Sequence, residues 1–132
     1  MPRQTDLSRP VDVYKAIIDE LATETSRGIS ERLVAQEGIF SKAPDHRAFN
    51  TFVQSLSTDQ RQVLAQMLHI QRTGAIHDVL AVLSWWVGPG KVGFTFRGES
   101  MPVGLSGMGL HGDYVGRQND WEWPSDDSPA AT

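Results

Sequence analysis

The sequence predicts a mainly α protein of the α+β class: a bundle of four to five helices over residues 9–87, then a small β-hairpin and a glycine-rich wrapped loop. Two observations predict this architecture. Before residue 88, apolar residues recur every three or four positions, which is the spacing of one helix face. After residue 88 they alternate instead, and nine of the 12 glycines lie between Gly88 and Gly116.

The first two helical segments are marked by residues that start or stop helices. Pro10 follows Ser8 at the predicted start of the first helix, which we expect to end near Gly28. A shorter segment begins near Ser30 and is expected to stop near Gly38. The first helix carries an apolar stripe made of Val11, Tyr14, Ile17, Ile18 and Leu21.

Three more helices are predicted up to residue 87. The third begins near Pro44 and carries Phe49, Phe52, Val53 and Leu56 on one face. Residues 57–59, Ser-Thr-Asp, predict the N-cap of a fourth helix, and Gly74 predicts its end. The fifth helix, residues 76–87, is apolar on most sides, so we expect it to be the most buried helix.

Alternating apolar residues after the helices predict a β-hairpin. Residues 92–96 and 101–105 are the two expected strands, on either side of Gly98–Glu99. A glycine-rich loop is expected beyond Leu105, and a third short strand near residues 113–115 is left open. We expect residues 1–124 to form a single helical domain with a C-terminal β element. Residues 125–132 are expected to be a disordered acidic tail.

Composition excludes several classes of site and partner. The 132 residues include no cysteine, so disulfides, thiolate zinc sites and cysteine nucleophiles are excluded. The formal net charge is −4 and the basic residues are scattered, which argues against nucleic-acid binding. The N-terminal residues are polar and no apolar run is long enough to cross a bilayer. We therefore expect a cytoplasmic protein without a cofactor, a nucleic-acid partner or a membrane partner.

The segment Gly107-Met-Gly-Leu-His-Gly112 matches the dinucleotide-binding fingerprint letter by letter. That motif functions only between a buried strand and a helix of a βαβ unit. No helical stripe or returning strand is evident after Gly112, so we do not predict nucleotide binding. Glycine favours a packed loop here. The alternative is an anion or small-ligand site formed by Gly107, Gly109 and Gly112 together with Tyr114 and Arg117.

Histidine and aspartate occur together twice. His111 and Asp113 lie two positions apart in the glycine-rich segment, and His77 and Asp78 begin the most apolar helix. These four candidate catalytic residues would suit a metal site or an oriented base if the fold brought them together, with His69 as a fifth member. No ligand-spacing motif accompanies them. His77, His111 and Asp113 are thus candidate metal ligands that also have simple structural interpretations.

The tryptophans are candidate interface residues. Adjacent residues on a helix point about 100° apart, so Trp85 and Trp86 are both buried only if their helix is covered on two sides. A second subunit or the C-terminal segment would provide that cover. Trp121 and Trp123 alternate, so they present one aromatic face that either packs on the helices or binds a partner. We expect self-association or a protein partner through Trp85, Trp121 and Trp123.

Several stretches in the second half resemble a small bacterial family of unknown function. They are Ala75-Ile-His-Asp-Val-Leu-Ala81, Phe96-Arg-Gly-Glu-Ser-Met-Pro-Val103, Leu105-Ser-Gly-Met-Gly-Leu-His-Gly-Asp-Tyr-Val-Gly-Arg117 and Trp121-Glu-Trp-Pro124. The resemblance covers residues 73–124, and residues 107–117 are its most specific part. It implies a bacterial protein and supplies no activity, cofactor or catalytic residue.

Three functions remain open from the sequence. The first is an interaction or regulatory module that uses residues 107–117 and the C-terminal aromatic residues. The second is a small metal-dependent or His/Asp hydrolase-type enzyme, and the third is a module that binds an anion or small ligand through Arg117 or Arg97 and loop amides. We favour the first because the sequence holds no recognisable catalytic motif.

Overall fold

The computed structural model describes residues 7–23 and 28–125. Apart from Ser125, which is exposed, the predicted tail lies outside the described residues. The described residues form two compact units, the first made of residues 7–23 and 76–125 and the second of residues 28–75. Helix α4 (Thr58–Val87) contributes residues to both units. Each unit is described here by itself.

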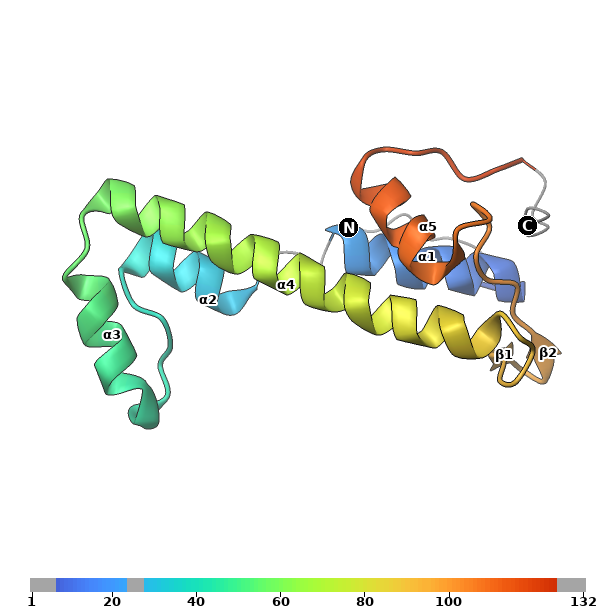
Figure 1. Cartoon of the computed structure of the whole chain (residues 1–132), viewed down its shortest axis with the longest axis horizontal. Coiled ribbons are helices and arrows are strands. Elements are labelled where there is room, and N and C mark those ends of the chain that lie inside the picture. The colour runs from blue at the N-terminus through green and yellow to red at the C-terminus, as the bar shows by residue number, and fades with distance from the viewer. Residues whose placement is uncertain (1–6, 24–27, 126–132) are drawn as a thin grey trace. The chain divides into compact units, whose positions relative to one another are not determined.

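The predicted fold class is confirmed: helices dominate, and the only sheet in the described part is a two-stranded hairpin (Figure 1). In the same residues, no helix combines the length and apolar character needed to cross a membrane. The helices are α1 (Pro10–Thr23), α2 (Ile29–Arg32), α3 (Arg47–Gln54), α4 and α5 (Gly109–Gln118), with a π-helical turn at Leu33–Glu37 and a 3-10 turn at Pro44–His46; the strands are β1 (Thr95–Phe96) and β2 (Glu99–Ser100).

The core of the first unit forms where α1 and α5 pack against each other (Figure 1). The apolar stripe predicted for α1 supplies part of it, because Val11, Tyr14 and Ile18 are buried at spacings of three and four. The other buried members come from α4, from the segment after the hairpin and from α5: Leu80, Leu105, Leu110 and Tyr114. This core fixes the segment around residues 103–114, on which the candidate site depends.

Helix α4 corrects two predictions. Gly74 does not end a helix, and residues 58–87 form one continuous helix of 30 residues. Gly74 is not among the glycines with positive φ, and, apart from its chain neighbours and the nearby backbone of its own helix, no atom lies within 4 Å of the position its Cβ would occupy. An interior glycine disfavours a helix by only about 1 kcal/mol relative to alanine, and the long helical segments on both sides outweigh it. The prediction that the fourth helix ends at Gly74 was therefore wrong.

The second correction concerns the burial of α4. Residues 76–87 were predicted to be the most buried helical segment, but Leu80 is the one residue of α4 that is buried. The opposite side of this segment carries exposed apolar residues, namely Val79, Val82, Trp85 and Trp86. The prediction was wrong because apolar composition on all sides does not require a cover on all sides. This part of α4 instead presents an apolar surface.

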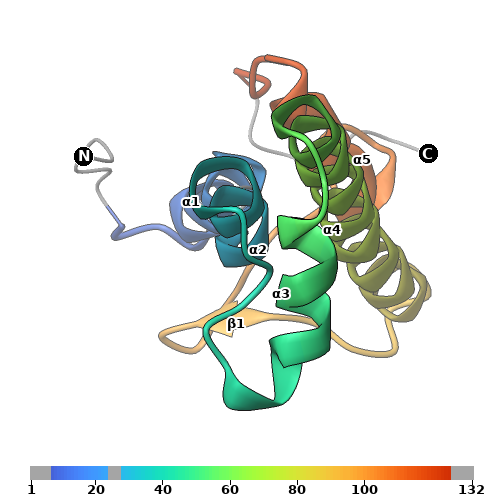
Figure 2. The same cartoon turned by 90° about the vertical axis from the view of Figure 1, so that its left-hand side faces the viewer.

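In the second unit, two helix boundaries fall where the sequence predicts them, at Gly38 and at Ser57, although the end predicted at Gly74 does not. Gly38 ends the π-helical turn in the left-handed conformation, with φ of 68°. Ser57 Oγ accepts a hydrogen bond from Gln60 N, and Gln60 Oε1 accepts one from Ser57 N, at 3.1 and 2.9 Å. This reciprocal capping box starts α4 and confirms the predicted N-cap. Figure 2 shows how α3 turns into α4 at this point.

The hairpin is confirmed but is shorter than predicted. Thr95 pairs with Ser100 and Phe96 with Glu99 in an antiparallel register. The turn residues are Arg97 and Gly98, with φ of 51° and 81°, so the turn lies one position before the expected Gly98–Glu99. Positive φ at both central residues is the signature of a type I′ turn, whose twist matches that of paired strands.

Residues 105–108 form a loop as predicted, but α5 takes the place of the rest of the expected glycine-rich loop and of the third strand that was left open near residues 113–115. Leu110, Asp113 and Tyr114 are buried on one face of this helix. Its glycines are required by packing: a Cβ on Gly112 would lie 2.4 Å from Met108 Cβ, and one on Gly116 would lie 3.0 Å from the Trp121 ring. Tertiary contacts thus impose a helix on a sequence of low helix propensity.

Candidate functional site

Asp113, a predicted catalytic and metal-binding candidate, is fully buried at 0% exposure. One carboxylate oxygen accepts hydrogen bonds from the Tyr14 hydroxyl and from Leu105 N, the latter at 2.8 Å, and the other accepts from Ser106 N at 2.8 Å. The Tyr14 oxygen in turn accepts from Gly104 N at 3.1 Å. The carboxylate therefore has a structural role here: it fastens residues 104–106 to α1 and α5.

Tyr14 is the neutral partner in this arrangement. Burial raises the pKa of the Tyr14 phenol well above its usual range, and the hydrogen bond to Asp113 raises it further. A phenol that keeps its proton can donate to a carboxylate and accept from a backbone amide at the same time. Tyr14 thus holds the start of the glycine-rich segment in place.

The predicted ligand-binding residues Tyr114 and Arg117 also face inward. Tyr114 is fully buried, and its hydroxyl accepts a hydrogen bond from Gln118. Arg117 donates to Asp19 and to the Trp121 carbonyl, and its guanidinium lies 5.4 Å from the centre of the Trp123 ring. Tyr114 and Arg117 therefore make contacts within the unit.

Trp121 and Trp123 pack back on the first unit, which is one of the two alternatives left open for them. Their rings meet edge to face with centroids 5.3 Å apart, and both lie against the core. The indole N–H of Trp123 donates to Asp19 at 3.2 Å. Trp85, by contrast, is 73% exposed, so of the three predicted interface tryptophans it alone presents most of its surface.

The glycines of the fingerprint-like segment serve packing and helix initiation. Gly107 and Gly109 have φ of 81° and 77°, and α5 begins at Gly109. Three amides of the segment are paired internally: Gly107 N donates to Gly104 O, Met108 N to Ser106 Oγ and Leu110 N to Ser84 Oγ. These pairings count against an anion nest built from the same amides. A βαβ unit does not occur in the described residues.

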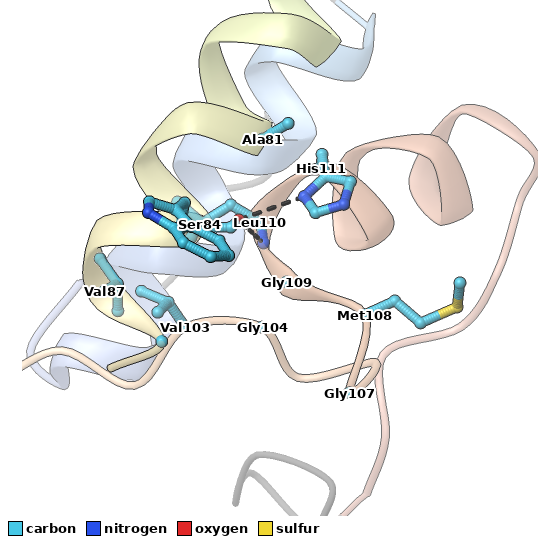
Figure 3. A pocket seen from close by; sticks show the side chains of 12 residues that line it. Ala81, Ser84, Val87, Val103, Gly104, Gly107, Met108, Gly109, Leu110 and His111 are labelled. Carbon is cyan, nitrogen blue, oxygen red and sulfur yellow. Dashed lines mark hydrogen bonds between the residues drawn. The ribbon is translucent and has the colours of Figure 1, made fainter. Parts of the chain in front are cut away.

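A cavity of about 470 Å³ opens beside this segment, entirely within the first unit (Figure 3). One wall is a face of α4, and the other is the segment after the hairpin together with the start of α5. Trp85 and Met108 line it and are 73% and 71% exposed. The first wall consists of Ala81, Ser84, Trp85 and Val87 of α4 with Gly88 directly after it, and the second wall of Val103, Gly104, Gly107, Met108, Gly109, Leu110 and His111.

Ser84 and His111 supply the polar part of the cavity. Ser84 Oγ lies 2.9 Å from Leu80 O, 2.8 Å from Leu110 N and 3.2 Å from His111 Nδ1. When the hydroxyl proton points to Leu80 O, His111 Nδ1 is the protonated nitrogen that donates to Ser84. Neutral His111 therefore carries its acceptor at Nε2, the ring nitrogen turned away from Ser84 in Figure 3.

The same hydrogen bonds give Ser84 a structural task. Met108 is the N-cap residue of α5, but its side chain accepts no hydrogen bond from the first turn of the helix. Ser84 of α4 instead accepts the hydrogen bond of the Leu110 amide in that turn. Ser84 joins α4 to α5 and lines the cavity.

Only part of the predicted His/carboxylate cluster comes together. The rings of His77 and His111 have centroids 5.3 Å apart at an interplanar angle of 89°, and His77 Nδ1 lies 3.3 Å from Asp78 Oδ1. His69 pairs with Glu31 in the second unit, at 3.1 Å. No group of three or more His, Asp or Glu in the described residues is placed to hold a metal ion. Asp113 therefore forms no such group with the two histidines.

Sequence reasoning singled out His111, Gly107 and Gly109 but missed most of the cavity. Met108, Ala81, Val103 and Ser84 were not among the candidate residues. One available signal was the spacing of Ala81, Ser84, Trp85 and Gly88 at positions i, i+3, i+4 and i+7, which places them on one side of a helix. Small residues beside an exposed tryptophan leave room for a ligand.

Comparison with known proteins places the chain in a family. The family model for the Family of unknown function (DUF6547) matches residues 7–125. No curated protein and no solved structure matches the chain. The matched range contains both walls of the cavity and the Tyr14–Asp113 pair.

Proposed function

Because the chain belongs to this family of unknown function, we propose a function from its geometry: the protein is an interaction module whose cavity beside α4 receives an aromatic side chain of a protein partner. The observation that carries the proposal is the exposure of Trp85 and Met108 on the walls of that cavity, at 73% and 71%. Large exposed apolar groups around a hollow are typical of binding surfaces.

The walls suit an aromatic ring. Trp85 offers an indole against which a second ring can stack or meet edge to face, and Met108 offers a flexible thioether that contacts aromatic rings favourably. Gly104, Gly107 and Gly109 add no side chains to the opposite wall, so a ring can approach the backbone there. Aromatic residues are also the most frequent energetic anchors of protein interfaces.

His111 adds a preference among aromatic residues. Its Nε2 makes no hydrogen bond among the described residues and is the acceptor of the neutral ring. A tyrosine hydroxyl can donate to that nitrogen, whereas phenylalanine cannot. We therefore propose tyrosine as the anchoring residue of the partner, selected over phenylalanine by one hydrogen bond worth about 1 kcal/mol.

The apolar surface continues beyond the cavity. Val79, Val82 and Trp86 lie on the side of α4 that the first unit leaves exposed. A protein partner would cover this stripe together with Trp85, which a small molecule in the cavity would not do. The stripe supports a macromolecular partner, and sedimentation at increasing concentration tests whether that partner is a second copy of the chain.

Titration of the chain with capped amino acids tests the proposal. N-acetyl-tyrosinamide is expected to shift the NMR signals of the Gly107, Gly109 and His111 amides and of the Trp85 indole, and N-acetyl-phenylalaninamide to shift them less at equal concentration. Benzoate is the third probe. Shifts caused by benzoate alone would favour the anion-binding alternative, and an absence of shifts at the cavity with all three probes would overturn the proposal.

A further inference from the structure

We propose that His77 and His111 form a binding site for a late first-row divalent metal ion, such as Zn²⁺ or Cu²⁺. The two imidazoles come from different helices, α4 and α5, and their ring centroids lie 5.3 Å apart. Two imidazoles that bind one ion at about 2.1 Å with a tetrahedral angle place their ring centres about 5 Å apart. The observed separation agrees with that of two imidazoles sharing one ion, and it is also that of an edge-to-face contact between two rings.

The hydrogen bonds around both rings leave the same nitrogen available. His77 Nδ1 lies 3.3 Å from the Asp78 carboxylate, and His111 Nδ1 lies 3.2 Å from the Ser84 hydroxyl. Neither Nε2 makes a hydrogen bond among the described residues. Histidines that bind metals usually donate Nδ1–H to a carboxylate, hydroxyl or carbonyl in this way, which fixes the tautomer and makes Nε2 the ligand.

The surroundings favour a cation with exchangeable ligands. The Asp78 side chain is 84% exposed and carries its negative charge next to His77, and both histidines are accessible enough for water to complete the coordination. Two imidazole ligands suit Cu²⁺ and Zn²⁺ and are poor ligands for Mg²⁺, which prefers oxygen. With two protein ligands, Cu²⁺ is expected to bind more tightly than Zn²⁺, and Mg²⁺ not at all.

Isothermal titration of the full chain with ZnCl₂, CuCl₂ and MgCl₂ tests the site. His77→Gln and His111→Gln are each expected to weaken Zn²⁺ and Cu²⁺ binding more than tenfold. His69→Gln is the matched control, because His69 lies in the second unit beside Glu31, and it should bind as the unmodified chain does. Asp78→Asn, which keeps both ligands, is expected to weaken binding about tenfold by loosening the orientation of His77.

The outcomes separate this site from the proposed docking function. Equal binding by the unmodified chain, H77Q and H111Q would overturn the metal site, as would the absence of any Zn²⁺ or Cu²⁺ binding. A loss of binding in H69Q would place the ion elsewhere and would also overturn it. NMR spectra of each variant show whether the fold is kept. Both proposals use His111 Nε2, so N-acetyl-tyrosinamide is titrated in the absence of metal, where H77Q, which removes no cavity residue, is expected to bind it as the unmodified chain does.

Discussion

The Tyr14 hydroxyl donates a hydrogen bond to the Asp113 carboxylate, which lies 99 positions later in the chain. Both side chains are buried, and the same carboxylate accepts the amides of Leu105 and Ser106. This pair joins the first and last helices of the first unit and fixes the segment between them. The shape of the cavity beside α4 therefore depends on residues that do not line it.

Removal of the Tyr14 hydroxyl is expected to destabilise the protein. Tyr14→Phe leaves Gly104 N without its acceptor and Asp113 with one donor fewer, so the free energy of unfolding should fall by about 1–3 kcal/mol. Urea unfolding of Y14F, Asp113→Asn and the double variant measures the coupling between the two residues. Strictly additive effects of the two substitutions would contradict the proposed partnership.

Stability is expected to fall at alkaline pH because of Tyr14. Burial and the bond to Asp113 raise its folded-state pKa, so the phenol of the folded protein stays neutral while that of the unfolded chain ionises near pH 10. The stabilisation is thus complete below about pH 10 and is lost as the pH rises further. Urea unfolding between pH 8 and pH 11 should show a steeper loss for the unmodified protein than for Y14F. Parallel curves would refute this.

Two glycine substitutions are expected to have opposite effects. Gly74→Ala lies in the middle of a continuous helix with open space around the new methyl group, so it should stabilise the protein by about 0.5–1 kcal/mol. Gly112→Ala should destabilise it, because the methyl group would lie 2.4 Å from Met108 Cβ. Thermal unfolding checks both. A destabilising Gly74→Ala would mean that α4 is interrupted at that position.

Ser84 is expected to stabilise the junction of α4 and α5. Ser84→Ala removes the acceptor of the Leu110 amide and the partner of His111 Nδ1, which should lower the free energy of unfolding by about 0.5–2 kcal/mol. Ser100→Ala, at an exposed position of β2, is the control and should have little effect. Faster hydrogen exchange of the first turn of α5 in S84A alone would support the capping role. Unchanged exchange would contradict it.

Much of the helical architecture could be predicted because it rests on local patterns. The stripe of α1 and the capping box at Ser57 involve residues within a few positions of one another. Glycine was the main source of error. At Gly74 the surrounding helix outweighs its preference, and in α5 glycines are present because neighbouring side chains leave no room for a Cβ. Composition shows where glycine is enriched and does not show which of these reasons applies.

The candidate site was predictable only in part for a related reason. His111 was recognisable as a polar residue in an unusual segment, and its proximity to His77 agrees with the cluster that was considered. The burial of Asp113 depends on Tyr14, and no pattern near residue 113 indicates a partner at residue 14. Likewise, Trp85 is exposed because no other described segment packs over its side of α4, and the sequence of the helix does not indicate this.

The most direct measurement of the central proposal is the affinity of N-acetyl-tyrosinamide for Trp85→Ala compared with Trp86→Ala. The two residues are adjacent, of the same type and on the same helix, but only Trp85 lines the cavity. We predict that W85A weakens binding at least tenfold, about 1.4 kcal/mol, while W86A binds as the unmodified chain does. Equal affinities of W85A and W86A would contradict the account.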